Sequence, residues 1–195
     1  MNRIIIGLIL IIGSINQTFG QNLQEGQKRW SSEQKLTIDD FKIKISDDNT
    51  DAVYSQFMIS HAIGGFDFMK RNLNQKIENI FLGNASWIDT TKVTEIQKQI
   101  DFQQMQFDIA EIHARKFRKR ALVNKKKIAK GFDIINQINN EIMAEFSENR
   151  LQLVKETESG QNEEKIAEWK EKIATELKKL YEFRYENKKK IKLNK

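Results

Sequence analysis

The spacing of apolar residues divides the chain into a first half with the periodicity of strands and a second half with that of helices. In the first half, apolar residues alternate with polar ones through residues 36–45 and 72–82, and residues 53–63 are rich in β-branched and aromatic side chains. These patterns predict three short strands, because every second side chain of a strand points to the same face and such residues favour strands. Gly64-Gly65 and Gly83-Asn84 follow the last two stretches as turn signals. The simplest arrangement of three such strands is an antiparallel meander.

After Thr90 the apolar residues recur at helical spacing. Two apolar stripes share one helix, the first through Ile96, Ile100, Phe107 and Ala114, and the second through Phe102, Met105, Ile109 and Ile112. Together they cover more than half of the circumference, so the helix is predicted to be buried on most sides. The remaining arc, predicted to face solvent, carries Asp101, Asp108, Glu111, Arg115 and Lys119.

Two more helices are predicted in the last third of the chain. One extends from about Lys126 to Glu156, and Gly160 is suited to end it. The next follows Asn162, which can cap its first turn, and extends to about Leu180. The chain contains no proline, and long uninterrupted helices agree with that lack, since proline breaks a helix interior.

These elements predict an α+β fold: a small antiparallel sheet of about three strands packed on a buried central helix, followed by a long C-terminal helical hairpin. The length of 195 residues suits one domain, which we place at residues 21–187. Its first residues, 21–35, are polar and are expected to be a loose lead-in with Trp30 as an anchor. Residues 188–195 are expected to be a basic disordered tail.

The first twenty residues have the three-part pattern of a secretory signal peptide. Arg3 supplies a positive start, residues 4–12 are almost wholly apolar, and small and polar residues lead to Gly20. The apolar run is too short for a bilayer span, which takes about 20 residues. We expect a signal peptide at residues 1–20, cleavage near Gly20 and a periplasmic or secreted protein without a stable transmembrane anchor. The alternative is an uncleaved N-terminal anchor.

Composition excludes several kinds of chemistry. The chain has no cysteine and only two histidines, so disulfides, thiolate metal sites and sites of three histidines are impossible. It also lacks a phosphate-binding loop, a nucleophile elbow and a dinucleotide fingerprint.

One segment resembles a known protein family. Residues 104–120 read Gln-Met-Gln-Phe-Asp-Ile-Ala-Glu-Ile-His-Ala-Arg-Lys-Phe-Arg-Lys-Arg. They resemble a family of exported bacterial proteins regarded as zinc-dependent proteases and otherwise known as a domain of unknown function. In that family a helix begins His-Glu-Gln-x-His and continues Phe-Asp-Ile-Ala-Glu, and the second part stands here at residues 107–111.

Three further motifs of the family have counterparts in matching order. Leu-Thr-Trp-x-Asp-Phe is similar to residues 36–41, and Ser-Trp-Val is similar to residues 86–88. Tyr-Asp-x-Glu-Thr-x-His-Gly is similar to residues 153–160, where the family's histidine is replaced by Ser159. The resemblance covers most of residues 30–180 and implies a zincin-like, metallopeptidase-type fold for the domain.

The residues that hold zinc in that family are missing from the matching positions. His-Glu-x-x-His places two imidazoles on one helix face, with the glutamate beside the metal-bound water. Here these positions are Phe102, Gln103 and Gln106, and Ser159 replaces a third ligand. Phenylalanine cannot ligate, and a glutamine amide is a poor zinc ligand and no general base. We therefore predict no catalytic residue, no metal and no cofactor, with zinc expected only if the site is rearranged.

A relict pocket is predicted around Phe102, Gln103, Gln106, Asp108 and Ser159. The resemblance makes Asp108 a supporting group of the former site, and the alternative is a surface ion pair. Glu111 lies about 180° from position 102 on the helix and is interpreted as a surface ion-pair partner of Arg115 or Lys119.

The two histidines are too far from these positions to replace the lost ligands. His113 lies about 16 Å along the helix from position 102 and is expected to be half-buried. His61 is expected in the core or at the edge of a strand, and a pocket role is the alternative.

Basic residues gather in residues 116–130 and 188–195 of a chain with a net charge of +6. They indicate contact with an anionic envelope component, such as membrane headgroups or surface polymer, or else a solvated helix end. Nucleic acid is not expected, because the chain has an export signal and no aromatic–basic binding motif.

The sequence as a whole predicts an exported zinc-protease-like protein that acts as a non-catalytic binding or scaffold protein, a pseudopeptidase with an unknown protein or peptide ligand. The alternatives are an active zinc-dependent peptidase or hydrolase with a rearranged site, and a helical interaction module that uses the basic helix ends and the terminal hairpin.

Overall fold

The computed structural model of the chain describes residues 23–45, 51–64, 66–131 and 133–193. The predicted signal peptide lies outside these described residues. Within them, no helix is both long enough and apolar enough to cross a membrane.

The sheet is antiparallel and has three strands, as the sequence predicts. β1 (Gln27–Arg29), β3 (Phe57–His61) and β4 (Ile77–Leu82) pair in the order β1-β4-β3, with Met58 opposite Ile80. The meander is wrong, because the last strand in sequence is the central one. A separate two-stranded ladder joins β2 (Val53–Tyr54) to β5 (Trp87–Ile88).

The first strand is not where alternation places it. Residues 36–45 form no strand in the structure; they contain the 3₁₀ turn η1 (Ile38–Asp40) instead. The Asp40 carboxylate accepts a hydrogen bond of 2.7 Å from the backbone of Thr37, which closes this turn locally. β1 lies in the segment expected to be a loose lead-in, because its backbone pairs with the free edge of β4.

The helices begin and end close to the predicted positions. α1 is Ile96–Val123, α2 is Lys125–Ile128, α3 is Asp133–Glu156 and α4 is Glu163–Lys179. The helix predicted as continuous from 126 to 156 is divided after α2. Asn162 caps α4 as predicted, since its side chain accepts a 3.1 Å hydrogen bond from the Lys165 backbone. The remaining turns are 3₁₀ helices, η2 (Asp67–Met69), η3 (Asn74–Lys76), η4 (Gly83–Ala85) and η5 (Tyr181–Phe183).

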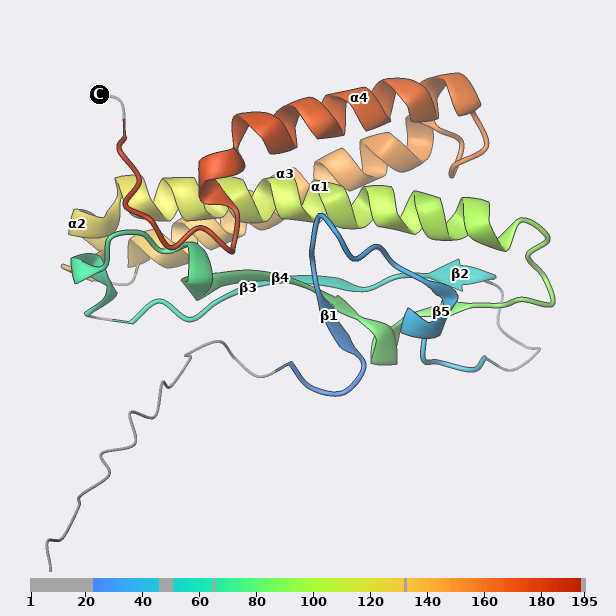
Figure 1. The fold of residues 1–195 in the computed structure, drawn as a ribbon, viewed down its shortest axis with the longest axis horizontal. Coiled ribbons are helices and arrows are strands. Elements are labelled where there is room, and N and C mark those ends of the chain that lie inside the picture. Colours follow the sequence, from blue (N-terminus) through green and yellow to red (C-terminus); the bar gives the residue numbers. More distant parts are fainter. Residues whose placement is uncertain (1–22, 46–50, 65, 132, 194–195) are drawn as a thin grey trace, which may run out of the picture.

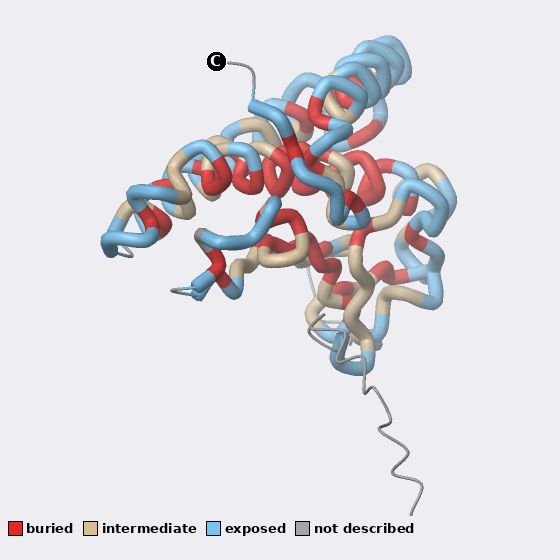
Figure 2. Tube along the Cα trace, turned by 60° about the vertical axis from the view of Figure 1, so that its left-hand side comes forward, coloured by how far each residue is buried: buried red, intermediate tan, exposed pale blue. Residues whose placement is uncertain are grey.

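α1 is the centre of the molecule. It packs on β3 and β4 with one side and on α3 and α4 with the other (Figure 1). The rings of Phe57 and Phe81, from the sheet, lie 5.5 and 6.1 Å from the ring of Phe107. Figure 2 shows the buried residues gathered in the interior of the molecule, with exposed chain around them. The predicted burial of a central helix against a small sheet is confirmed.

The arc of α1 predicted to face solvent is largely covered. Glu111 and Arg115 are 1% and 3% exposed, whereas Asp101 and Lys119 do face solvent. The covering comes from residues 30–36 and from α4, whose Leu177 carbonyl accepts a hydrogen bond from Arg115. The Trp30 indole donates to Asp108, and the Leu36 backbone donates to Gln104, so the lead-in lies on α1.

The C-terminal segment beyond α4 also packs on the domain. Ile191 is buried, and the Asn72 side chain donates hydrogen bonds to the carbonyls of Asn187 and Lys189. Residues 188–193 were expected to be part of a basic disordered tail. In the structure this segment lies against the β3–β4 connection. The last two residues of the chain lie outside the described residues.

Candidate functional site

The helix positions that correspond to the family's metal ligands are occupied by packed side chains. Phe102 is buried, and its ring lies against Gly160 in the turn between α3 and α4. A Cβ built on Gly160 would stand 2.9 Å from Cγ of Phe102, closer than real Cβ contacts. Gly160 also has φ = +91°, which favours glycine over any residue with a side chain. The aromatic ring therefore fills the space beside this turn.

The two glutamines take part in a buried hydrogen-bonded chain. The Gln106 amide donates to Oε1 of Gln103 at 2.9 Å, and its own Oε1 accepts a 2.6 Å bond from Nε of Arg150. Arg150, on α3, also donates to the Ser55 carbonyl at 3.1 Å. Its guanidinium carbon lies 5.4 Å from the centre of the Phe57 ring. The space beside position 106 is thus filled by a cation that is already hydrogen-bonded.

The turn that carries Ser159 lies beside Phe102, although the two are far apart in sequence. Glu158, Ser159 and Gly160 have successive φ angles of 52°, 58° and 91°. The buried Thr157 hydroxyl closes the turn by donating to the Leu153 carbonyl and accepting from the Gly160 backbone. Ser159 itself is exposed. Of the predicted relict pocket, Phe102 contacts the turn that carries Ser159 through Gly160, and Gln103 is hydrogen-bonded to Gln106.

Asp108 belongs to a different contact. Its carboxylate accepts hydrogen bonds of 2.7 Å from both the Trp30 indole and the Gln104 amide, and Lys35 lies 3.8 Å away. Burial raises the pKa of Asp108 above its usual value, although the Trp30 hydrogen bond acts in the opposite direction. Asp108 therefore fastens the N-terminal segment to α1 and makes no contact with Gln106 among these bonds.

Glu111 forms a buried ion-pair cluster with two arginines. Its Oε1 accepts from Nε of Arg115 at 3.0 Å and from a terminal nitrogen of Arg118 at 2.8 Å. Arg115 is the predicted partner, but the pair is buried, so the surface interpretation is wrong. Arg118 also donates to the carbonyls of Ile77 and Phe183. The cluster joins the sheet, α1 and the segment after α4, and so serves the fold.

The histidines lie away from the candidate site. His113 is 0% exposed, more buried than predicted, and neither of its ring nitrogens has a hydrogen-bond partner among the described residues. Burial lowers its pKa to about 4. His61 lies on the edge strand β3, as expected, with its ring against Phe117. In the part of the chain that the structure describes, no three histidine or acidic residues are grouped as metal ligands would be.

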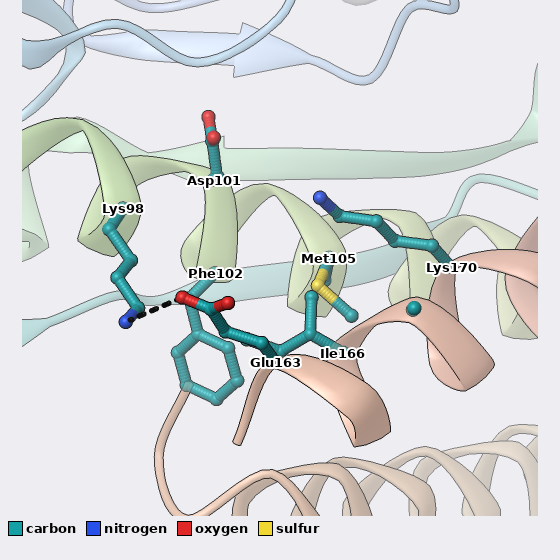
Figure 3. Close-up of a pocket in the computed structure, with 8 residues that line it drawn as sticks. Lys98, Asp101, Phe102, Met105, Glu163, Ile166 and Lys170 are labelled. Atoms are coloured by element: carbon teal, nitrogen blue, oxygen red, sulfur yellow. Dashed lines mark ion pairs between the residues drawn. The ribbon is translucent and has the colours of Figure 1, made fainter. Parts of the chain in front are cut away.

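A groove opens beside Phe102, between the first turns of α1 and α4. Its volume is about 400 Å³, and Figure 3 shows Met105 of α1 and Ile166 of α4 facing each other across it. Lys98 and Glu163 approach to 3.8 Å at one end, and Lys170 lies at the other. Such a groove, apolar inside and charged at its rim, has the size and lining of a small binding site.

Sequence reasoning missed two residues that shape this region. Arg150 lies between Phe146 and Leu153 on the apolar stripe of α3, and a charged residue on such a stripe signals a buried partner. Gly160 was expected only to end a helix, and its close approach to Phe102 has no local sequence signal. The sequence marks Arg150 as unusual, but its partners and the contact of Gly160 with Phe102 depend on how α3 packs against α1.

The fold and site define a class: an α+β protein in which a central helix carries a polar, internally hydrogen-bonded patch beside a small groove. Comparisons with protein-family models, with curated proteins and with solved structures found no match to this chain.

Proposed function

We propose that this protein is an exported, non-catalytic binding protein on a zincin-like scaffold whose metal site has been replaced by packed side chains. The observation that carries the proposal is the contact of the Ser159–Gly160 turn with Phe102. The sequence resemblance assigns ligand positions to 102, 106 and 159 without any information on distance. In the fold, Gly160, next to Ser159, contacts Phe102, which supports the assignment of positions 102 and 159 to one former site.

The side chains now present support binding rather than catalysis. Phe102, Gln103, Gln106 and Arg150 include no carboxylate or imidazole that could act as a general base. Filling such a site also avoids the cost of leaving polar ligands buried without a metal. We propose the α1–α4 groove as the binding site, with an extended peptide as ligand. One apolar side chain would lie between Met105 and Ile166, and rim charges would pair with the peptide's polar groups.

Metal content and peptidase activity test the non-catalytic part of the proposal. The purified protein is expected to contain far less than one zinc ion per chain and to cleave none of a broad set of peptides. Stoichiometric zinc together with cleavage that a chelator abolishes would favour the alternative, an active peptidase with a rearranged site.

Restoring the ligands tests whether positions 102, 106 and 159 belong to one former site. The variant F102H/Q106H/S159H is expected to bind zinc at least about tenfold more tightly than F102H/Q106H, because the third imidazole adds a ligand to a metal that takes four. Circular dichroism would confirm that both variants fold. Equal affinities would show that residue 159 does not reach the site and would remove this support.

The groove is tested with peptides selected by display on the immobilised protein. Ala167 lines the groove on α4, and A167R is expected to reduce binding of the selected peptides at least about tenfold. Ala174, exposed on the same helix but outside the groove, provides the matched control A174R. Equal losses in both variants, or none in either, would reject the groove as the site.

Export is tested by the mass of the protein recovered outside the cytoplasm. We propose that it begins at Gln21, after removal of residues 1–20. A mass that retains these residues would favour the uncleaved anchor.

A further inference from the structure

One end of the molecule combines exposed apolar residues with a dense group of cations. Three segments meet there: the η2 loop (residues 66–71), the α1–α2 junction (residues 122–130) and the C-terminal segment (residues 188–193) (Figure 1). We call this surface the η2–α2 face. Residues of all three segments line a hollow of about 400 Å³, among them Met69, Leu122 and Ile191.

The apolar side chains at the tip of this face are unusually exposed. Phe66 and Met69 are 81% and 67% exposed, and the Met69 backbone donates to the Phe66 carbonyl at 3.2 Å, so one tight turn presents both. Leu193 is 41% exposed at the end of the adjoining segment. Figure 2, in which this end of the molecule is turned forward, shows exposed chain at its tips. Large apolar side chains in water mark an interaction surface when they occur together.

The charge around these side chains is almost entirely positive. The sequence of the three segments contains one acid, Asp67, and its basic residues are Lys70, Arg71, Lys125, Lys126, Lys127, Lys130, Lys188, Lys189, Lys190 and Lys192. The Asp67 carboxylate is buried and already pairs with Lys70 at 3.0 Å and with Lys76 at 3.2 Å. It therefore does little to offset the positive field.

We propose that the η2–α2 face docks on the surface of an anionic lipid bilayer, with Phe66 and Met69 inserted among the headgroups and the surrounding lysines in contact with lipid phosphates. The exposed apolar side chains and the surrounding lysines together favour this partner. A bilayer interface accepts an aromatic and a thioether side chain while its anionic lipids attract lysines. A free polyanion would satisfy the lysines but would leave Phe66 and Met69 in water. This surface is separate from the α1–α4 groove, so the inference does not depend on the proposed function.

Vesicle co-sedimentation of the full chain tests the proposal. The protein is expected to bind vesicles of phosphatidylcholine with about 30% phosphatidylglycerol and to bind phosphatidylcholine alone much more weakly. Binding to the anionic vesicles is expected to fall as the salt concentration is raised. Residues 1–20 are the same in every variant, so differences between variants report on the η2–α2 face and not on the apolar N-terminus.

Two variants separate the apolar from the cationic contribution. F66S/M69S and K126Q/K127Q/K130Q are each expected to weaken binding to anionic vesicles at least about tenfold, since each removes several exposed contacts. The matched controls are L151S/Y181S and K44Q/K155Q/K178Q, which change exposed residues outside the face and are expected to bind as the parent does.

A lipid contact is distinguished from a polyanion contact by the response of the apolar pair. In F66W, brominated phosphatidylcholine in the anionic vesicles is expected to quench the new tryptophan, which shows depth in the bilayer. Loss of binding in the lysine variant alone, with F66S/M69S unchanged and no quenching, would identify a polyanion site and overturn the proposal. Absence of binding to anionic vesicles would overturn it as well.

Discussion

At the scale of single residues, the polar groups inside this protein are stabilised by partners distant in sequence. Glu111 is the clearest case, because its carboxylate pairs with two arginines that also donate to backbone carbonyls of β4, α4 and η5. A buried charge with complete hydrogen bonding is tolerated, whereas one that loses its partner is costly. The stability of the central helix therefore depends on this carboxylate.

Removing the carboxylate of Glu111 is expected to destabilise the protein severely. Glu111→Ala leaves the Arg115 and Arg118 guanidiniums buried without an acidic partner, at a cost of about 3–5 kcal/mol in the free energy of unfolding measured with urea. The control is Glu168→Ala, which removes an exposed pair with Lys165 and is expected to cost less than about 1 kcal/mol. Similar losses in both variants would contradict the assignment of Glu111 as a buried centre.

His113 makes a prediction about acid stability. Burial lowers its folded pKa to about 4, below the value of 6.5 for an accessible histidine, and the nearby Lys116 adds to the shift. As the pH falls, the unfolded chain therefore takes up a proton before the folded one does. The stabilising contribution of neutral His113 is complete above pH 6.5 and is lost between 6.5 and about 4, amounting to about 3 kcal/mol.

The measurement is the free energy of unfolding at pH 7 and pH 4 for the parent and for His113→Leu. The variant is expected to lose about 3 kcal/mol less than the parent over this interval, because it has no imidazole to protonate. His61→Leu is the matched control, with a smaller effect expected because His61 is only half-buried. An identical pH response in the parent and His113→Leu would rule out the buried neutral histidine.

At the scale of elements, caps and turns account for the helix boundaries. Asn162 and Gly160 were both recognisable from sequence, because capping depends on one side chain and one backbone angle. The division between α2 and α3 was not predicted, although Gly131 lies there; its backbone N–H donates to the Ile128 carbonyl, and a side chain at this position would meet no neighbour. A glycine in a polar, basic stretch gives too weak a local signal to separate an interruption from a continuous helix.

The turn between α3 and α4 contains strain that one substitution should relieve. Ser159 has φ = 58°, where a side chain costs about 1–2 kcal/mol that glycine avoids. Ser159→Gly is therefore expected to raise the free energy of unfolding by about 1 kcal/mol in thermal or urea unfolding.

The same substitution at Ser147 provides the control. Ser147 is exposed in the interior of α3, where glycine is a poorer helix former than serine, so Ser147→Gly is expected to lower stability by about 0.5 kcal/mol. Effects of equal sign at the two positions would contradict the left-handed turn.

At the scale of the whole molecule, both ends of the described chain are fastened to the central α1–sheet unit. Asn74, in η3, is 1% exposed, and its side-chain nitrogen donates to the carbonyls of Glu182, Arg184 and Asn187. One amide thus holds the irregular segment after α4 in place. The same segment supplies the carbonyl of Phe183 to Arg118.

Asn74→Ala is expected to release this segment locally. Trypsin should then cleave at Lys188–Lys190 at least about tenfold faster, because local opening costs less free energy without the three hydrogen bonds. Asn84→Ala, which removes a single exposed bond to the Glu25 carbonyl, is expected to leave cleavage there unchanged. An unchanged rate in Asn74→Ala would show that Ile191 and Asn72 hold the segment without Asn74.

The sequence by itself determined the elements whose signals are local. The helical periodicity of α1, α3 and α4, the strand signals of β3 and β4 and the cap at Asn162 are properties of neighbouring residues, and they predicted the α+β class. Only the tertiary structure placed β1 beside β4, covered Glu111 and Arg115, and put Gly160 against Phe102. These depend on contacts between segments far apart in the chain, where the free energy comes from burial and pairing across elements, and no local pattern records which partner a residue will meet.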